Sequence, residues 1–356
     1  MNADLTAAYN ATGRAWQVGA GPVYDRLADV VVGQCPVPLA GARVLDLGAG
    51  TGAAWRAARR RGANVVAVDI AVGMLTAAAR RPPSVAGDAV ALPFLPGSFD
   101  AVIAAFSLNH LARPVAGLRE AVRVLAAGGG LVVSAYSADD HHPVKAATDA
   151  AAAARGWRPE PWYLALRERA VPRLATVERA GQVAAEAGLD GADLRTVRVS
   201  FPELGARDLV AWRLGMAQLA PFVAGLPRQA RAALVRDALG RLGPEPPVLV
   251  RSLVVLRWRD GRRPSRDVTG CAQPSTRDAN ARTASPSGAS AATATARRSA
   301  SARQVALPNS AASPATSGQP SRAAQWPSSP TTASSRPRSL AGWPPASAPT
   351  AVASRA

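Results

Sequence analysis

Short apolar runs alternate with helical patterns of apolar residues between about residues 43 and 136. The runs are almost continuously apolar, as expected of strands that are buried on both faces of a sheet. We predict strands at residues 43–47, 64–69, 84–86, 99–106 and 131–136. Helices are predicted between them at residues 50–61, 72–81 and 115–125. This order is typical of a parallel sheet with crossover helices.

The segments on either side of this stretch are mainly helical. Residues 5–32 are predicted to be helical, with turns around residues 19–22. After residue 136 the pattern indicates helical pieces within 141–172, a helix at 176–187, and two amphipathic helices within 206–242 that are broken near Pro221 and Pro227. Two more strands are predicted, at 194–201 and 248–258. Together these elements predict an α/β fold with a sheet of about seven strands.

The composition changes abruptly after Asp260. Residues 261–356 are mostly Ala, Ser, Pro, Thr and Arg, with almost no Val, Ile, Leu or Phe. Such a segment buries too little apolar surface to offset its conformational entropy, so a disordered tail is predicted. We therefore expect a folded domain at residues 1–260. The abrupt change also suggests a frame-shifted extension of a GC-rich gene, with a natural flexible tail as the competing account.

The formal net charge of +18 is divided between these two regions. Residues 261–356 hold twelve arginines and two aspartates, and the excess in the domain is spread along the chain. No specific nucleic-acid partner is therefore expected.

No apolar run is long enough to span a membrane, and the first residues do not resemble a signal peptide, so a cytoplasmic protein is expected. Cys35 and Cys271 lie one in each region, which gives no disulfide framework.

The glycine-rich segment 46–52 carries the main chemical signal. Its residues are Asp46, Leu47, Gly48, Ala49, Gly50, Thr51 and Gly52. Glycines between a strand and a helix let a ligand approach the backbone, and the spacing also fits a dinucleotide fingerprint, with Asp69 placed to bind a ribose. A carboxylate at position 46 would repel a pyrophosphate, whereas it would attract a cationic ligand. The segment therefore favours a cationic cofactor over a dinucleotide.

At these residues the sequence resembles the class I S-adenosylmethionine-dependent methyltransferases, whose first motif is an acidic residue followed by three alternating glycines. The segments Leu92-Pro93-Phe94, Ser98-Phe99-Asp100 and Phe106–Leu111 are similar to those of the type 11 group, which includes the ubiquinone and menaquinone biosynthesis methyltransferases. The resemblance is close over about residues 40–136. It implies a Rossmann-like doubly wound sheet whose last strand is antiparallel, with lid elements at 1–35 and 206–242.

The resemblance also implies a cofactor and the residues that bind it. S-adenosylmethionine is the expected cofactor, and a small molecule is the expected acceptor. Asp69 would bind the ribose hydroxyls, and Asp88 would hold the adenine amino group. The complete set of expected cofactor-binding residues is Asp46, Gly48, Ala49, Gly50, Thr51, Gly52, Asp69, Ile70, Met74, Asp88, Ala89 and Phe106.

Catalytic groups leave a weaker trace in the sequence. His110 follows the fourth strand, where the acceptor should lie, so it is the candidate general base; a helix-capping role is the alternative. The run at 139–142, Asp-Asp-His-His, could bind a divalent metal, but adjacent side chains rarely point to one ion, and no metal site is predicted. The candidates to line an acceptor pocket are Tyr9, Trp16, Tyr24, Trp162, Trp212 and Met216.

Two other functions stay open at this point. One is a nicotinamide-dependent oxidoreductase, against which Asp46 argues. The other is a regulatory protein that binds the cofactor without turnover. The sequence indicates neither the accepting atom nor the oligomeric state.

Overall fold

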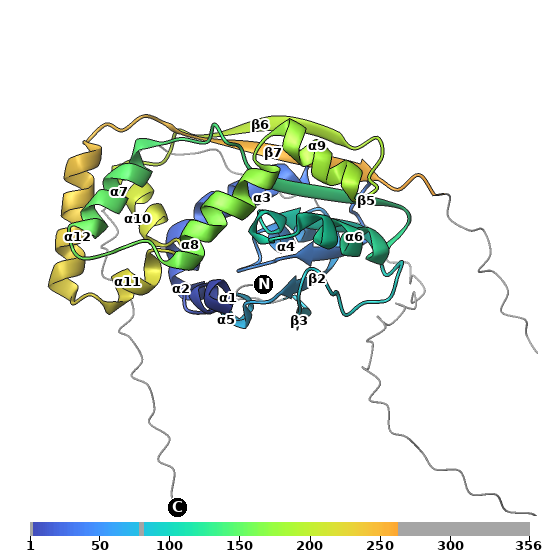
Figure 1. Cartoon of the computed structure of the whole chain (residues 1–356), viewed down its shortest axis with the longest axis horizontal. Helices are drawn as coiled ribbons and strands as arrows, with labels where there is room; N and C mark the ends of the chain where they lie inside the picture. The colour runs from blue at the N-terminus through green and yellow to red at the C-terminus, as the bar shows by residue number, and fades with distance from the viewer. Residues whose placement is uncertain (1–2, 78–81, 263–356) are drawn as a thin grey trace, which may run out of the picture.

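The structure is a computed structural model that describes residues 3–77 and 82–262. Seven strands form one sheet in the order β3-β2-β1-β4-β5-β7-β6 (Figure 1). They are β1 (Arg43–Leu47), β2 (Asn64–Asp69), β3 (Ser84–Ala86), β4 (Phe99–Ala105), β5 (Leu125–Tyr136), β6 (Asp193–Phe201) and β7 (Leu249–Arg259). Only β7 is antiparallel to its two neighbours. The predicted Rossmann-like sheet, with its last strand antiparallel, is confirmed.

Helices cover both faces of the sheet, and each face has its own apolar cluster. The first face is covered by α3 (Gly21–Val32), α4 (Ala53–Arg60), α7 (Pro143–Ala153), α10 (Ala206–Leu214) and α12 (Arg228–Leu242). The second is covered by α6 (Pro114–Val124) and α9 (Val177–Glu186). Within β1, Val44 belongs to the first cluster and Leu45 to the second. Side chains alternate across a strand, so a strand covered on both faces must be apolar throughout.

The strand order reverses between β1 and β4, which are neighbours in the sheet although β2 and β3 lie between them in the chain. In open α/β sheets a crevice forms at such a reversal, outside the carboxyl ends of the strands, and ligands bind there. The segments that follow β1 and β4 are therefore placed to form a site.

The N-terminal segment lies over this edge. It consists of α1 (Ala3–Asn10), α2 (Gly13–Ala15) and η1 (Trp16–Ala20), which leads directly into α3. Its first helix is held on α5 (Val72–Ala77), because the Asn10 side-chain oxygen accepts a hydrogen bond from the Gly73 N–H at 2.8 Å. A Cβ at Gly73 would lie 2.2 Å from the Asn10 carbonyl oxygen, so only glycine permits this approach.

The remaining helices are inserted late in the chain. The segment between β5 and α9 contains α7, α8 (Pro161–Ala165), η3 (Leu166–Ala170) and η4 (Val171–Leu174). Between β6 and β7 lie α10, α11 (Ala220–Gly225) and α12. Figure 1 shows α7, α10, α11 and α12 gathered at one end of the molecule. None of the helices in the described ranges has both the length and the apolar character needed to cross a bilayer.

Some predicted boundaries are wrong. There is no turn around residues 19–22, because η1 is a π-helical turn that continues into α3. The region 206–242 holds three helices instead of two. The helix predicted from residue 50 begins at Ala53, because the glycines before it form the turn. Residues 78–81 of the predicted helix at 72–81, and residues 263–356 of the predicted tail, lie outside the described residues.

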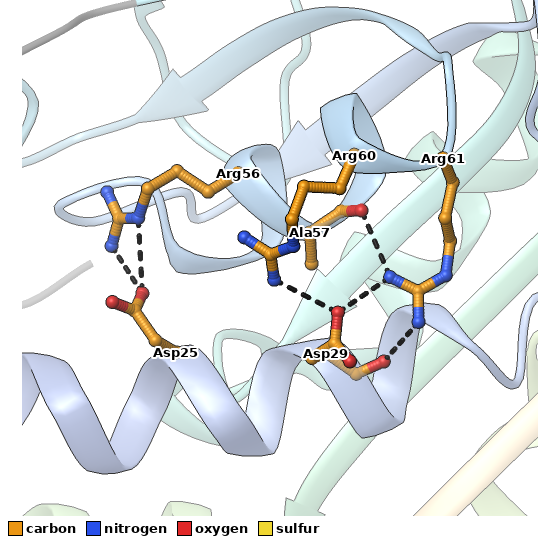
Figure 2. A network of polar contacts seen from close by, with 6 residues as sticks. All are labelled: Asp25, Asp29, Arg56, Ala57, Arg60 and Arg61. Atoms are coloured by element: carbon orange, nitrogen blue, oxygen red, sulfur yellow. Dashed lines mark hydrogen bonds and ion pairs between the residues drawn. The ribbon is translucent and has the colours of Figure 1, made fainter. Parts of the chain in front are cut away.

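A network of ion pairs joins α3 to α4 (Figure 2). The Arg56 Nε donates to Asp25 Oδ1 at 3.2 Å, and Arg60 and Arg61 donate to Asp29 Oδ1 at 3.0 and 2.8 Å. The hydrogen bond from Arg61 is the largest factor that lowers the pKa of Asp29. Arg60 and Arg61, at the end of α4, therefore have an acidic partner within the domain.

Candidate active site

The glycine-rich turn connects β1 to α4 at the carboxyl edge of the sheet. Gly48 has a φ of +73°, in the region that favours glycine. A Cβ at this position would lie 2.2 Å from the Cβ of Ser107, which follows β4. The Ser107 hydroxyl donates to the Leu47 carbonyl oxygen at 2.6 Å. The turn is thus fixed against the end of β4, and any side chain at position 48 would break that contact.

Asp46 is a buried carboxylate beneath this turn. It is 1% exposed, and its Oδ2 accepts a hydrogen bond from the Trp55 N–H at 2.8 Å. Within residues 3–77 and 82–262 it forms no ion pair. Burial raises the pKa of Asp46 to about 7, and the charge of Asp69 adds to the shift, while the Trp55 N–H opposes it. The charge of Arg56 acts on Asp46 from a distance, while its guanidinium is bonded to Thr51 and Asp25. The site therefore contains a buried carboxylate with no cation in direct contact.

Asp69 ends β2 and lies beside the same turn. Its Oδ2 accepts from the Gly50 N–H at 2.7 Å, and its Oδ1 accepts from the Ala71 N–H at 2.8 Å. Burial raises the pKa of this carboxyl group, and the two backbone N–H groups oppose the rise. Ile70 and Met74, which are predicted cofactor-binding residues, line the same pocket as Asp69.

Asp88 is placed differently from the other two acids. It is half-buried, and its Oδ1 accepts from the Val90 N–H at 3.1 Å in a local turn. Its neighbours Gly87 and Ala89 line the pocket, but the Asp88 side chain is not part of the pocket wall. Its predicted role toward adenine stays a prediction.

Four aromatic side chains form a wall of the site. The rings of Trp16 and Tyr24 lie 4.7 Å apart between centroids, and Tyr24 meets Phe106 edge-on at 5.4 Å. Tyr9 completes the row, 5.9 Å from Trp16. Phe106 has a φ of +58°, the one non-glycine residue in the described ranges with a left-handed backbone. Such strain is characteristic of functional positions, and here it lies at the end of β4.

The turn, the two acids and the aromatic wall line a single pocket. Its empty space, counted up to the opening toward solvent, is about 990 Å³. Predicted site residues that line it are Asp46, Gly48, Ala49, Gly50, Thr51, Asp69, Ile70, Met74, Ala89, Phe106 and His110. Gly52 does not line it; this residue is the N-cap of α4, with a φ of +87°.

His110 and Tyr9 face each other within this pocket. The Tyr9 hydroxyl lies 2.9 Å from His110 Nε2, and His110 Nδ1 lies 3.3 Å from the Ser107 carbonyl oxygen. Because a carbonyl only accepts, Nδ1 carries the proton and Nε2 accepts from Tyr9. Burial lowers the pKa of His110 to about 4, so the ring is neutral at pH 7. The alternative capping role is wrong, because α6 has Arg113 as its N-cap, with no side-chain cap.

The run at 139–142 lies at the same edge but does not form a metal centre. His142 caps α7 by accepting from the backbone N–H two residues later, and Asp140 pairs with Lys145 and Arg251. In the described ranges, no three His, Cys, Asp or Glu side chains gather where they could hold a metal ion.

Comparison with known proteins agrees with this geometry. The type 11 family described as "Methyltransferase domain" matches residues 45–133. A demethylmenaquinone methyltransferase of Beutenbergia cavernae is 39% identical over 146 residues, which are 40% of this chain and 59% of that protein. One from Mycolicibacterium paratuberculosis is 50% identical over 98 residues, 27% of this chain and 43% of that protein. Residues 45–133 of this chain are thus similar to a type 11 methyltransferase domain.

The match to these relatives is partial. This chain spans about half the length of the curated relatives that it matches. Among solved structures, phosphoethanolamine N-methyltransferase 2 of Haemonchus contortus, in complex with S-adenosyl-L-methionine, has a TM-score of 0.43 and 20% identity. That match covers 66% of this chain and 52% of the other.

Three of the residues predicted to line an acceptor pocket do not line it. Trp162 lies behind the aromatic wall, with its ring 6.5 Å from that of Tyr9. Trp212 packs over the guanidinium of Arg251, and neither it nor Met216 lines the pocket. Trp162 and Trp212 lie in inserted helices, and Met216 follows α10. The orientation of these segments toward residues 45–133 has no periodic signal in the sequence.

Sequence reasoning missed two features of the site. The partner of His110 could not be found, because Tyr9 lies 101 residues away in the N-terminal helix. Arg251 was also missed, although an arginine within the apolar strand β7 was visible as an exception to the pattern. A charge inside a strand that should be buried on both faces is the signal that could have identified it.

Proposed function

We propose that this protein transfers a methyl group from S-adenosylmethionine to a small-molecule acceptor. The observation that carries the proposal is a single pocket that contains both a buried carboxylate without a cation and a wall of four aromatic rings. The carboxylate suits a cationic cofactor, and the rings suit a planar acceptor. The match of residues 45–133 to the methyltransferase family supports the same reaction.

The residues of the pocket fit the cofactor. Asp46 and the turn at residues 48–51 would hold its charged amino-acid part, since Asp46 forms no ion pair among the described residues. Asp69 would accept hydrogen bonds from the ribose hydroxyls, and Ile70 and Met74 would pack on the adenine. When bound, S-adenosylmethionine supplies a methyl group that its sulfonium makes electrophilic.

The protein would then align the acceptor and remove its proton. Tyr9 and His110 supply the path. The proton of an acceptor O–H or N–H moves to the Tyr9 oxygen, while the Tyr9 proton moves to His110 Nε2. The imidazole becomes positively charged in a pocket that also contains the carboxylates of Asp46 and Asp69.

Aromatic lining also agrees with the names of the relatives, which methylate demethylmenaquinone. A planar ring system could pack between Trp16, Tyr24 and Phe106, whose side chains form a continuous row. We infer a planar acceptor of comparable ring size for this chain.

Calorimetry on the purified full chain tests the cofactor, with S-adenosylhomocysteine and NAD as ligands. S-adenosylhomocysteine should bind and NAD should not. Binding of NAD without any response to S-adenosylhomocysteine would show an oxidoreductase site instead.

The acceptor is then sought by incubating the protein and labelled cofactor with cell extract. A metabolite that gains the labelled methyl group confirms turnover. Cofactor binding with no labelled product from any extract would point to the regulatory alternative.

A further inference from the structure

A buried, positively charged cluster lies behind the aromatic wall of the pocket. It consists of Arg251, Lys145, Asp140, Tyr136 and Trp212, and we call it the Arg251 cluster. Arg251 is 2% exposed, and its guanidinium carbon lies 4.0 Å from the ring centroid of Tyr136 and 4.8 Å from that of Trp212. Two aromatic rings thus hold this charge in place by cation–π contact.

Positive charge exceeds negative charge in this cluster. Both Arg251 Nη2 and Lys145 Nζ contact the same oxygen of Asp140, Oδ2, each at 2.8 Å. The other oxygen of Asp140 accepts from the Ser252 N–H at 3.1 Å. One carboxylate therefore serves two cations. Burial lowers the pKa of Lys145, and the charge of Arg251 lowers it further.

Several donors of the cluster have no acceptor. Arg251 Nε and Nη1 and Trp212 Nε1 are buried and have no acceptor at hydrogen-bond geometry in the described part of the chain. The Tyr136 oxygen interacts with Tyr24 and with the Arg251 guanidinium. Unsatisfied donors on a buried charge reduce the stability of a fold, so native structures rarely leave them unpaired. What is missing is an acceptor, and the excess positive charge favours an anionic one.

The cluster contacts the aromatic wall of the pocket through Tyr136. Tyr136 packs on Phe106, with ring centroids 4.8 Å apart, and Tyr24 meets Tyr136 at 6.3 Å. Phe106 and Tyr24 both line the pocket. Arg251 is therefore one aromatic ring, that of Tyr136, behind the wall.

We infer that Arg251 determines acceptor specificity by binding an anionic oxygen, a carboxylate or phenolate, on a planar ring. The inference rests on the proposed function, since it needs an acceptor in this pocket. Tyr24 and Tyr136 move apart to admit the anionic group, which then accepts from Arg251 Nε and Nη1. Asp140 competes with this group for the guanidinium through its contact with the remaining nitrogen, Nη2.

The test uses salicylate and its neutral amide, salicylamide, as matched probes on the full chain saturated with S-adenosylhomocysteine at pH 7. We expect wild type to bind salicylate about tenfold more tightly than the amide, since a charged hydrogen bond is at stake. Arg251→Met should abolish this preference. Asp140→Asn should increase it, because the competing carboxylate is gone while the Ser252 N–H keeps an acceptor.

Arg257→Met is the control, because Arg257 lies on the same strand and pairs with Asp193 at the other end. It should keep the wild-type preference. Equal binding of both probes to wild type, or no salicylate binding at millimolar concentration, would overturn the inference. The inference would also be overturned by a salicylate preference that survives Arg251→Met or that falls in Asp140→Asn. In that case the donors of Arg251 would be satisfied by bound water instead.

Failure of the proposed function looks different. In that case S-adenosylhomocysteine does not bind the wild-type chain at all, whatever the probes do. If Arg251→Met fails to fold, seen as loss of S-adenosylhomocysteine binding, the Asp140→Asn result still decides the inference.

Discussion

Asp46 and Asp140 are both buried carboxylates at the carboxyl edge of the sheet, but their surroundings are opposite. Asp46 lies under the glycine-rich turn with a single backbone hydrogen bond to its Oδ2 and no ion pair among the described residues. Asp140 lies under the inserted helices, with Lys145 and Arg251 both on one oxygen. The first site has too little positive charge, and the second has too much.

In the proposed function, Asp46 belongs to the cofactor side of the pocket, and Asp140 belongs to the Arg251 cluster behind the aromatic wall, which we call the acceptor side. A buried carboxylate without a cation fits a ligand that brings one, as S-adenosylmethionine does. A buried guanidinium with free donors fits a ligand that brings an anion. In each place the proposed ligand would bring the charge that the protein does not supply. Substitutions in the two places should therefore have different effects.

The largest effect is expected from the residues between the two sides. His110→Ala should lower turnover by about 10²–10⁴-fold with the true acceptor, because general-base catalysis contributes that much. Tyr9→Phe should also lower turnover, since the ring stays and only the bridging hydroxyl is lost. Cofactor affinity should stay nearly unchanged in both, as measured by calorimetry. Unchanged turnover in His110→Ala would show that His110 is not the general base.

Asp46→Asn should weaken S-adenosylmethionine binding by about 2–3 kcal/mol, because it removes a charged partner. The same change should stabilise the protein without ligand. The pKa of Asp46 is raised from 3.8 to about 7 in the fold, so its destabilising effect is absent below about pH 4, grows as the pH rises toward 7, and is complete above pH 7. Thermal unfolding should show a gain in Tm at pH 8 that shrinks toward pH 4.

The matched control for this change is Asp100→Asn. Asp100 is a partly exposed carboxylate that pairs with Arg43 at 2.8 Å, on the neighbouring strand. It should leave cofactor affinity unchanged and should not raise Tm at pH 8. A Tm gain in both variants would mean that the effect comes from general charge reduction.

Asp69→Ala should weaken cofactor binding by roughly 1.5–3 kcal/mol, because it removes a charged acceptor for two hydroxyl donors. The Gly50 N–H also loses its partner, so the turn should become less rigid. Competition between S-adenosylhomocysteine and adenosine separates the two causes. If the ribose contact is lost, adenosine affinity falls as well, and unchanged adenosine affinity would contradict the assigned role.

The smallest effect is expected from removing the tail. A chain that ends near residue 264 should keep its Tm and its cofactor affinity, because the composition beyond that point has no periodic apolar face. Any retention on a nucleic-acid column should fall, since ten arginines are removed. Unfolding of the shortened chain would place the domain boundary further along the sequence.

The cofactor side could be predicted from the sequence because its signals are local. The strands at 43–47 and 64–69 have the predicted bounds, and the acid at position 46 lies two residues before the first glycine. Turn geometry, strand ends and acids all occur within a few residues of one another. Local propensity and tertiary structure agree there.

The acceptor side could not be predicted in the same way. Asp140 was noticed as part of a possible metal-binding run, but its partner Arg251 lies in the last strand. Trp212 was expected in the pocket, although it packs on Arg251 instead. The turn expected around residue 20 is absent, because packing against α10 favours a continuous π-helical turn. These outcomes depend on contacts between distant segments, which periodicity does not encode.

The most direct test of the central claim is the pH dependence of S-adenosylmethionine affinity. Because Asp46 must be ionised to pair with the cofactor and its pKa is about 7 in the free protein, affinity should rise by about tenfold between pH 5.5 and pH 7. Calorimetry in buffers of different ionisation enthalpy should show about one proton released per cofactor bound at pH 5.5. Asp88→Asn should retain this dependence. An affinity that is constant or falls over this interval, with no proton release, would contradict the claim that ionised Asp46 pairs with the cationic cofactor.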